Sequence, residues 1–253
     1  MNIKNIPGYL QLLLGVKANE VLGFRLVTKL AKHFVPTYRF TWAELAWFQD
    51  PELNDVLSRF EESEGLNAHR RFTLQQLLRL TSQIPGDTAE CGVYKGCGSY
   101  IILQANRRSS RGRVHHIFDS FEGLSTPSTE DGEYWTVNDL SMEETVVRKN
   151  LSEFSDVKLY KGWIPSRFSD VDSNVFSFVH VDVDLYEPTL ESVRFFYDRL
   201  STGGVFVCDD YGFITCPGAT AAIEEFLLSK PEKMVSLPGG GGFFIKGCVT
   251  SPV

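Results

Sequence analysis

Four aspartates in the second half of the chain have the spacing of a metal site. Asp182 and Asp184 follow one apolar run, and Asp209 and Asp210 directly follow the next. Residues two apart on a strand face the same side, so we expect Asp182 and Asp184 to point together. Carboxylates this close raise one another's pKa values, and a hard divalent cation such as Mg²⁺, which prefers oxygen ligands, resolves that conflict. The alternative is that aspartates cap helices or bond loop amides, which explains one of the four more readily than two pairs.

A glycine-rich segment at residues 90–99 suits a bound cofactor. Its sequence, ECGVYKGCGS, places three glycines where a predicted strand turns into a helix. Free N–H groups at a helix start bind anions, and glycines let a ligand approach the backbone, so a pyrophosphate or a cofactor carboxylate would fit. Asp119 ends the next predicted strand, where it is well placed to accept hydrogen bonds from ribose hydroxyls. The alternative is that these glycines serve only the packing of the turn.

Three further residues have both a functional and a packing interpretation. His180 precedes the first acidic pair, so it could orient an acceptor, act as a base, or support the site from behind. Tyr134 and Trp135 lie in a polar stretch, 122–140, that lacks periodicity and is typical of a functional loop. An aromatic ring there could stack on a sugar, or it could anchor the loop itself.

The elements that must position these residues alternate between strand and helix from residue 87 onward. The expected strands are 87–94, 113–119, 157–161, 175–183 and 203–208, and the expected helices are 98–108, 141–153, 189–200 and 218–229. This alternation predicts a parallel sheet with helices on both faces. Segments 234–237 and 242–246 predict a final hairpin, joined by Pro238 and by a run of four glycines of which the last, Gly242, begins the second segment.

Residues 1–85 have a different period and are expected to form a helical region ahead of a domain at 86–253. Apolar residues recur there at helical spacing, and Asp50 before Pro51 could cap a helix. The apolar run at 9–14 is too short to span a bilayer and is expected to lie in an amphipathic helix. The apolar faces exceed what the sheet can cover, so this region is expected to act as a lid or as a contact in a homo-oligomer.

Composition excludes some classes of function. The 253 residues carry a formal net charge of −7, which disfavours a nucleic-acid partner because phosphate binding needs clustered Lys and Arg. The five cysteines are widely spread and include no Cys-x-x-Cys pair, so a zinc knuckle or a disulfide framework is not expected. We therefore expect reduced thiols in a cytoplasmic protein that does not span a membrane.

Together these motifs resemble the macrocin O-methyltransferase family, also called the TylF family. The matching segments are 90–96 (ECGVYKG), 118–124 (FDSFEGL), 180–189 (HVDVDLYEPT), 208–212 (CDDYG) and 217–226, and the resemblance extends over about residues 65–247. The two aspartate motifs are its specific part. The resemblance implies an α/β fold, the class I methyltransferase Rossmann-like sheet, mostly parallel with a C-terminal antiparallel hairpin.

The resemblance also implies an activity and a set of site residues. S-adenosylmethionine and Mg²⁺ would serve the O-methylation of a small hydroxylated acceptor, a sugar moiety of a natural product or glycan. Asp182, Asp209 and Asp210 would hold the metal, and Asp184 would be the general base, with His180 as the alternative catalytic residue. The residues implied to line the cofactor are Glu90, Gly92, Tyr94, Ser99, Asp119, Gly162 and Trp163.

Two rival functions remain open at this stage. An NAD- or nucleotide-sugar-dependent oxidoreductase on a Rossmann sheet should have a tighter Gly-x-Gly-x-x-Gly turn and a Tyr-x-x-x-Lys base, and the sequence contains neither. A non-catalytic regulatory protein that binds S-adenosylmethionine would have no need for four converging acids.

Overall fold

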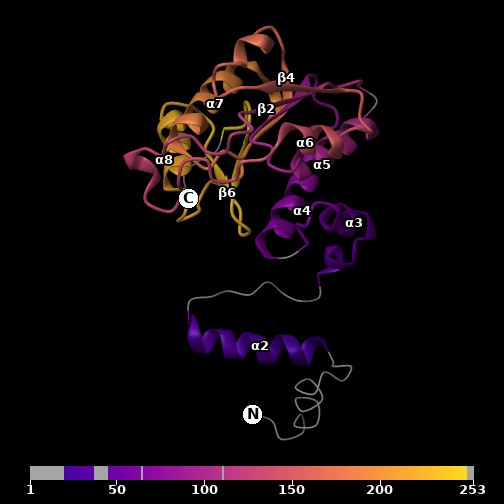
Figure 1. Ribbon diagram of the computed structural model, residues 1–253, viewed down its shortest axis with the longest axis vertical. Helices are drawn as coiled ribbons and strands as arrows, with labels where there is room; N and C mark the ends of the chain where they lie inside the picture. The colour runs from indigo at the N-terminus through magenta and orange to yellow at the C-terminus, as the bar shows by residue number, and fades with distance from the viewer. Residues whose placement is uncertain (1–19, 37–44, 64, 110, 250–253) are drawn as a thin grey trace, which may run out of the picture. The chain divides into compact units, whose positions relative to one another are not determined.

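A seven-stranded sheet organises the chain from Asp55 onward (Figure 1). The strand order is β3-β2-β1-β4-β5-β7-β6. The strands are β1 (Asp87–Cys91), β2 (His115–Asp119), β3 (Val157–Lys161), β4 (Phe176–Val181), β5 (Leu200–Cys208), β6 (Val235–Ser236) and β7 (Gly242–Ile245). The first five pair in parallel, and β7 pairs antiparallel with β5 and with β6. The predicted fold class, with its C-terminal hairpin, is confirmed.

The computed structural model describes residues 20–36, 45–63, 65–109 and 111–249. The chain divides into two compact units between residues 54 and 55. The unit with the sheet therefore begins well before residue 86 and includes helix α4 (Gly65–Leu80), which the prediction assigned to the N-terminal region. Among the described residues, no helix combines the length and the hydropathy needed to cross a bilayer.

The N-terminal unit contains α2 (Glu20–Phe34), η2 (Ala46–Gln49) and the start of α3 (Pro51–Arg59). Asp50 caps α3 as predicted, because its Oδ1 accepts hydrogen bonds from the N–H groups of Glu52 at 3.0 Å and Leu53 at 3.2 Å. Pro51 sits at the first helical position, where its missing N–H is not needed. The amphipathic helix expected around residues 9–14 lies outside the described residues.

Helices cover both faces of the sheet and divide its core in two. Helices α4, α5 (Cys97–Arg108) and α6 (Glu144–Asn150) lie on one face, and α7 (Tyr186–Arg199) and α8 (Pro217–Leu227), adjacent in Figure 1, lie on the other. Every residue of β4 is buried, as expected of a central strand covered on both sides. The short helices η3 (Thr129–Asp131) and η4 (Phe168–Val171) lie in the connections.

The topology places a crevice beside β1 and β4. The chain leaves β1 toward β2 and β3 and then returns to β4 on the opposite side of β1. In open α/β sheets, ligands bind outside the carboxyl ends of the strands at such a reversal. The predicted acids follow these strand ends, so the topology brings them together.

Two of the five predicted parallel strands end earlier than expected. Strands β1 and β4 end at Cys91 and Val181, rather than at residues 94 and 183. The backbone leaves the extended region because Gly92 has φ 79° and Asp184 has φ 60°. Asp182 and Asp184 therefore lie in an irregular segment beyond the end of the strand, and not side by side on one strand face.

Candidate active site

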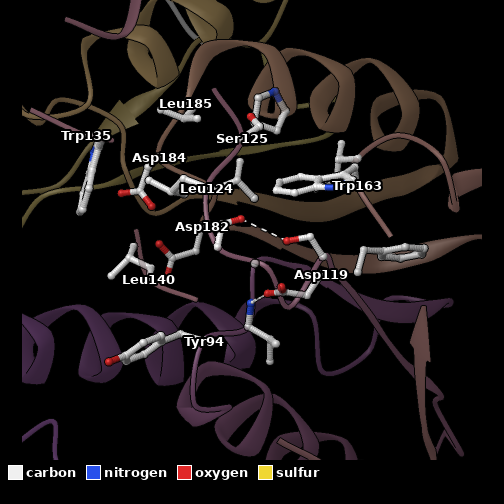
Figure 2. A pocket seen from close by; sticks show the side chains of 18 of the residues that line it. Tyr94, Asp119, Leu124, Ser125, Trp135, Leu140, Trp163, Asp182, Asp184 and Leu185 are labelled. Atoms are coloured by element: carbon white, nitrogen blue, oxygen red, sulfur yellow. Dashed lines mark hydrogen bonds between the residues drawn. The ribbon is translucent and has the colours of Figure 1, made fainter. Parts of the chain in front are cut away.

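A cavity of about 570 Å³ opens at the carboxyl ends of the central strands (Figure 2). Seven of the predicted site residues line it, namely Gly92, Tyr94, Asp119, Gly162, Trp163, Asp182 and Asp184. Figure 2 shows Asp119 and Trp163 toward one end, Asp184 and Trp135 toward the other, and Asp182 between them. The cavity therefore has room for two ligand portions that meet near Asp182.

A tight turn after β1 forms the wall near Asp119. The Val93 N–H donates to Asp119 Oδ2 at 2.7 Å, and the Phe121 N–H donates to Asp119 Oδ1 at 2.6 Å. Burial raises the pKa of this carboxyl group, although the two amides favour its ionised form. These bonds fix the orientation of Asp119 and leave each oxygen able to accept a further hydrogen bond.

Gly92 allows this turn to approach the end of β4 closely. A Cβ at this position would lie 1.8 Å from the carbonyl oxygen of Asp182, and φ is 79°.

We predict that Gly92→Ala lowers the free energy of unfolding by about 2–4 kcal/mol, from left-handed strain and overpacking together. Gly112→Ala is the matched control, because Gly112 has φ 59° but an added Cβ would meet nothing within 4 Å. Urea denaturation should give a smaller loss there, about 1 kcal/mol, and equal losses would contradict the close-approach argument.

Glu90 and Ser99, for which a cofactor contact is predicted, are not among the residues that line the cavity. Both are buried behind it, and the Ser99 hydroxyl donates to Glu90 Oε2. Glu90 Oε1 lies 2.7 Å from His180 Nδ1, and Ser99 Oγ lies 3.0 Å from His115 Nε2. The reason is strand alternation: Glu90 faces helix α5, where Gly98 leaves room for its carboxylate.

His180 likewise lies behind the cavity wall. It is fully buried, and its Nε2 lies 3.7 Å from Asp209 Oδ1 while its Nδ1 contacts Glu90. Burial opposes its protonation, but the carboxylates of Asp209 and Glu90 raise the pKa of His180 to about 10. His180 is therefore absent from the cavity lining, and its buried Nε2, which makes no hydrogen bond within the described structure, faces Asp209.

Asp182, Asp209 and Asp210 converge on one point, which is occupied by a guanidinium nitrogen. Arg70 Nη2, from α4, lies 3.1 Å from Asp182 Oδ1 and 3.6 Å from Asp210 Oδ1, and it contacts Asp209 Oδ2. Asp210 Oδ2 points away from this position and accepts the N–H groups of Val183 and Asp184 at 3.1 and 2.8 Å. One oxygen of each aspartate therefore faces a common centre.

The crowding of these acids shifts their pKa values in different directions. Burial and the charge of Asp209 raise the pKa of Asp182 to about 6. Burial and the charge of Asp184 raise the pKa of Asp210 well above its usual range. Burial would raise the pKa of Asp209 as well, but Arg70 and His180 hold it well below its usual value. The acids thus interact strongly, and a cation at their centre would favour their ionised forms.

Asp184 borders this cluster, with a carboxylate oxygen within 4.8 Å of one of Asp210, and it faces the Trp135 end of the cavity (Figure 2). It has φ 60°, is 7% exposed, and accepts a hydrogen bond from the Cys216 thiol at 3.5 Å. The Trp135 indole N–H donates to Cys216 Sγ at 3.3 Å, which ties the loop to the same thiol. Burial and the charge of Asp182 raise the pKa of Asp184 to about 7. A carboxylate of this kind can accept a proton near neutral pH.

Sequence reasoning missed Arg70, Arg71 and Cys216. Arg71 Nε donates to Glu62 Oε2 at 2.6 Å, and both arginines line the cavity. A signal existed for Arg71, because it lies three residues from Ala68 and from Leu74 on the buried side of α4. A charged residue on an apolar helical face usually has a buried partner.

The donor set fits a hard divalent cation. Asp182, Asp209 and Asp210 offer carboxylate oxygens, which Mg²⁺ prefers. Asp209 Oδ2 is a buried oxygen whose described contacts are the ion pairs with Arg70 and Arg71. The Arg70 nitrogen marks a position within reach of all three carboxylates. Ligand atoms within 4.8 Å of one another form two groups among the described residues, His180 with Asp182 and Asp209, and Asp184 with Asp210 and Cys216. A neutral thiol is a poor ligand for a hard ion.

Comparisons of structure place this fold among the class I O-methyltransferases. The calicheamicin methyltransferase CalS11 superposes with a TM-score of 0.64 at 17% identity, over 84% of this chain and 96% of that one. The O-methyltransferase NovP superposes with a TM-score of 0.57 at 23% identity, over 71% of this chain and 80% of that one. At these identities the likeness establishes the fold.

The sequence profile of the macrocin-O-methyltransferase (TylF) family matches residues 68–234, and the chain belongs to this family. It is 26% identical over 182 residues to demethyldecarbamoylnovobiocin O-methyltransferase of Streptomyces niveus, covering 63% of this chain and 68% of that enzyme. It is 26% identical over 162 residues to mycinamicin III 3''-O-methyltransferase of Micromonospora griseorubida, covering 58% of this chain and 62% of that enzyme. The protein is thus an O-methyltransferase, and its family implies S-adenosylmethionine as the methyl donor.

Proposed function

We propose that this enzyme transfers a methyl group from S-adenosylmethionine to a sugar hydroxyl of a small glycosylated molecule, and that transfer requires Mg²⁺. The observation that carries this proposal is the convergence of Asp182, Asp209 and Asp210 on one point beside Asp184. The names of the two relatives support a natural product as the acceptor. A Rossmann oxidoreductase has no use for this cluster, and a regulatory protein would not need a base beside it.

The cofactor is proposed to occupy the end of the cavity near Asp119 and Trp163. Asp119 would accept hydrogen bonds from the ribose hydroxyls with the lone pairs that Val93 and Phe121 leave free. Trp163 and Gly162 would flank the adenine, and Gly92 and Tyr94 would border the methionine portion. The methyl group would then point toward Asp182 and the second half of the cavity.

Asp182, Asp209 and Asp210 are proposed to hold the metal ion. Bound there, Mg²⁺ would lower the pKa of the acceptor hydroxyl and offset the negative charge of the cluster. Glu90 and His180 would keep Asp209 oriented, since His180 contacts both side chains. Their proposed role is therefore support, in place of the cofactor contact and the catalysis expected from sequence.

Asp184 is proposed to take the proton from the acceptor hydroxyl. Methyl transfer from a sulfonium is an in-line displacement, in which the oxygen must lie about 3 Å from the methyl carbon. Asp184 suits a base because it lines the cavity and because its pKa is raised to about 7 by burial and by Asp182. The Cys216 thiol holds the carboxylate in place.

The acceptor is proposed to bind between Trp135, Leu124 and Leu140, which line the cavity near Asp184 (Figure 2). An indole face and apolar side chains suit a sugar ring and an attached hydrophobic skeleton.

Residues 1–85 are proposed to serve as a lid or as a contact in a homo-oligomer, and light scattering of the full chain tests the second role. The free thiols of the described cysteines support a cytoplasmic location, which fractionation of the native host would test.

Ligand binding tests the proposed function directly. Calorimetry should detect S-adenosylmethionine binding in the micromolar range, as is usual for enzyme substrates, and should detect no NAD binding. Isotope-labelled S-adenosylmethionine with a panel of glycosylated acceptors should then yield a product heavier by one labelled methyl group, seen by mass spectrometry. Binding of NAD without binding of S-adenosylmethionine would refute the proposal.

A further inference from the structure

Helix α4 inserts Arg70 into the cluster that would hold the metal. The charged contacts described for its guanidinium go to Asp182, Asp209 and Asp210, all through Nη2. The side chain is 16% exposed, and its guanidinium carbon lies 5.5 Å from the centre of the Phe213 ring. A full positive charge is thus enclosed at the point where the three carboxylates meet.

The neighbouring Arg71 is held differently. It is anchored to Glu62 by two contacts, Nε to Oε2 at 2.6 Å and Nη2 to Oε1 at 3.5 Å. Its Nη1 lies farther from the cluster, 3.7 Å from Asp182 Oδ2 and 3.6 Å from Asp209 Oδ2. Because Arg71 has its own carboxylate partner, it can keep its position whatever cation fills the centre. Arg70 has its described charged partners only within the cluster.

A guanidinium nitrogen and a divalent ion cannot occupy the same point. Both neutralise the same three carboxylates, and each would repel the other strongly at such a short distance in a buried setting. Ionised carboxylates packed this closely, two of them buried, are costly without a counter-ion, so a cation at this point stabilises the charged form of the cluster.

We propose that Arg70 is the internal counter-ion of the metal-free enzyme and that the divalent ion binds by displacing it. This inference rests on the proposed metal site. Arg70 also lines the cavity, so its displaced guanidinium can turn into that space without leaving the protein interior. The consequence is that Arg70 stabilises the metal-free fold and weakens metal affinity, so that loading requires a side-chain rearrangement on α4.

Titration with Mn²⁺, followed by electron paramagnetic resonance, tests this inference. Arg70→Gln removes the competing charge and keeps a polar side chain, so it should bind Mn²⁺ about tenfold or more tightly than the wild type. Arg79→Gln is the matched control, because Arg79 is exposed near the end of the same helix. It should bind Mn²⁺ with wild-type affinity. Arg70→Lys retains a positive charge on a side chain of different length. Its Mn²⁺ affinity should lie between those of the wild type and Arg70→Gln.

Thermal denaturation provides a readout that does not depend on activity. In EDTA, Arg70→Gln should melt at a lower temperature than the wild type, and saturating Mn²⁺ should raise its midpoint more than it raises the wild-type midpoint. If Arg70→Gln folds only with Mn²⁺, the inference is supported.

Two results would overturn the inference, and they have different consequences for the proposed metal site. Equal or weaker Mn²⁺ binding by Arg70→Gln would refute the displacement of Arg70 while the proposed metal site remains. Absence of Mn²⁺ binding in every variant, the wild type included, would remove both the inference and the metal dependence of the proposed function.

Discussion

Asp184→Asn should slow methyl transfer by about 10²–10⁴-fold, the usual effect of losing a general base. Asparagine keeps the shape of the side chain and an oxygen that can accept the Cys216 hydrogen bond, but it cannot take a proton. It also tolerates the left-handed backbone at this position, where φ is 60°. The variant should therefore fold and bind both S-adenosylmethionine and Mg²⁺ nearly as tightly as the wild type. Single-turnover kinetics with isotope-labelled donor measure the effect.

Asp198→Asn is the control for this substitution, because Asp198 is an exposed carboxylate on α7 outside the cavity lining. Its turnover should equal that of the wild type. Near-normal turnover of Asp184→Asn would mean that another group is the base. His180 is the alternative base predicted from the sequence. To act as the base, it would have to rotate out of its buried contacts with Glu90 and Asp209.

Asp209→Asn should abolish activity and metal binding together. Asp209 lies at the centre of the cluster, in contact with Arg70 and 3.7 Å from His180, and its pKa is held low by both cations against the effect of burial. The substitution removes a ligand oxygen and a charge at once. Loss of a group that merely supports a metal ligand costs about 10–100-fold in affinity, so loss of the ligand itself should exceed about 100-fold. Isothermal titration with Mg²⁺ and the methyl-transfer assay measure the two losses.

Asp184→Asn and Asp209→Asn are best compared side by side. Both should lose turnover, but only Asp209→Asn should lose Mg²⁺ affinity, because Asp184 is proposed to face the acceptor. Chelation of the wild type with EDTA should stop the reaction, and added Mg²⁺ should restore it. Activity that survives exhaustive chelation would exclude the metal model. The ion pairs with Arg70 would then explain why Asp182, Asp209 and Asp210 lie together.

The sequence by itself determined the alternation of strands and helices and the edge where the acids gather. The apolar segments that form β4 and β5 can be recognised locally in the sequence. The residues that follow each segment must then lie at the end of a strand. Parallel strands direct their carboxyl ends to one edge of the sheet, so the sequence alone predicts that Asp182 and Asp209 lie near each other. The cap of Asp50 on α3 was equally local, because it involves only the next few residues.

The tertiary structure decided which side chains reach the cavity and which cation meets the acids. Glu90 and Ser99 belong to a segment typical of cofactor binding, yet the packing of α5 over β1 turns them into the core. Arg70 comes from a helix that precedes Asp182 by more than a hundred residues, and Cys216 reaches Asp184 from the start of α8. Periodicity reports which face of an element is apolar, but the direction in which one helix crosses a sheet depends on the side chains of both. Contacts between distant elements therefore emerge only when the whole core packs.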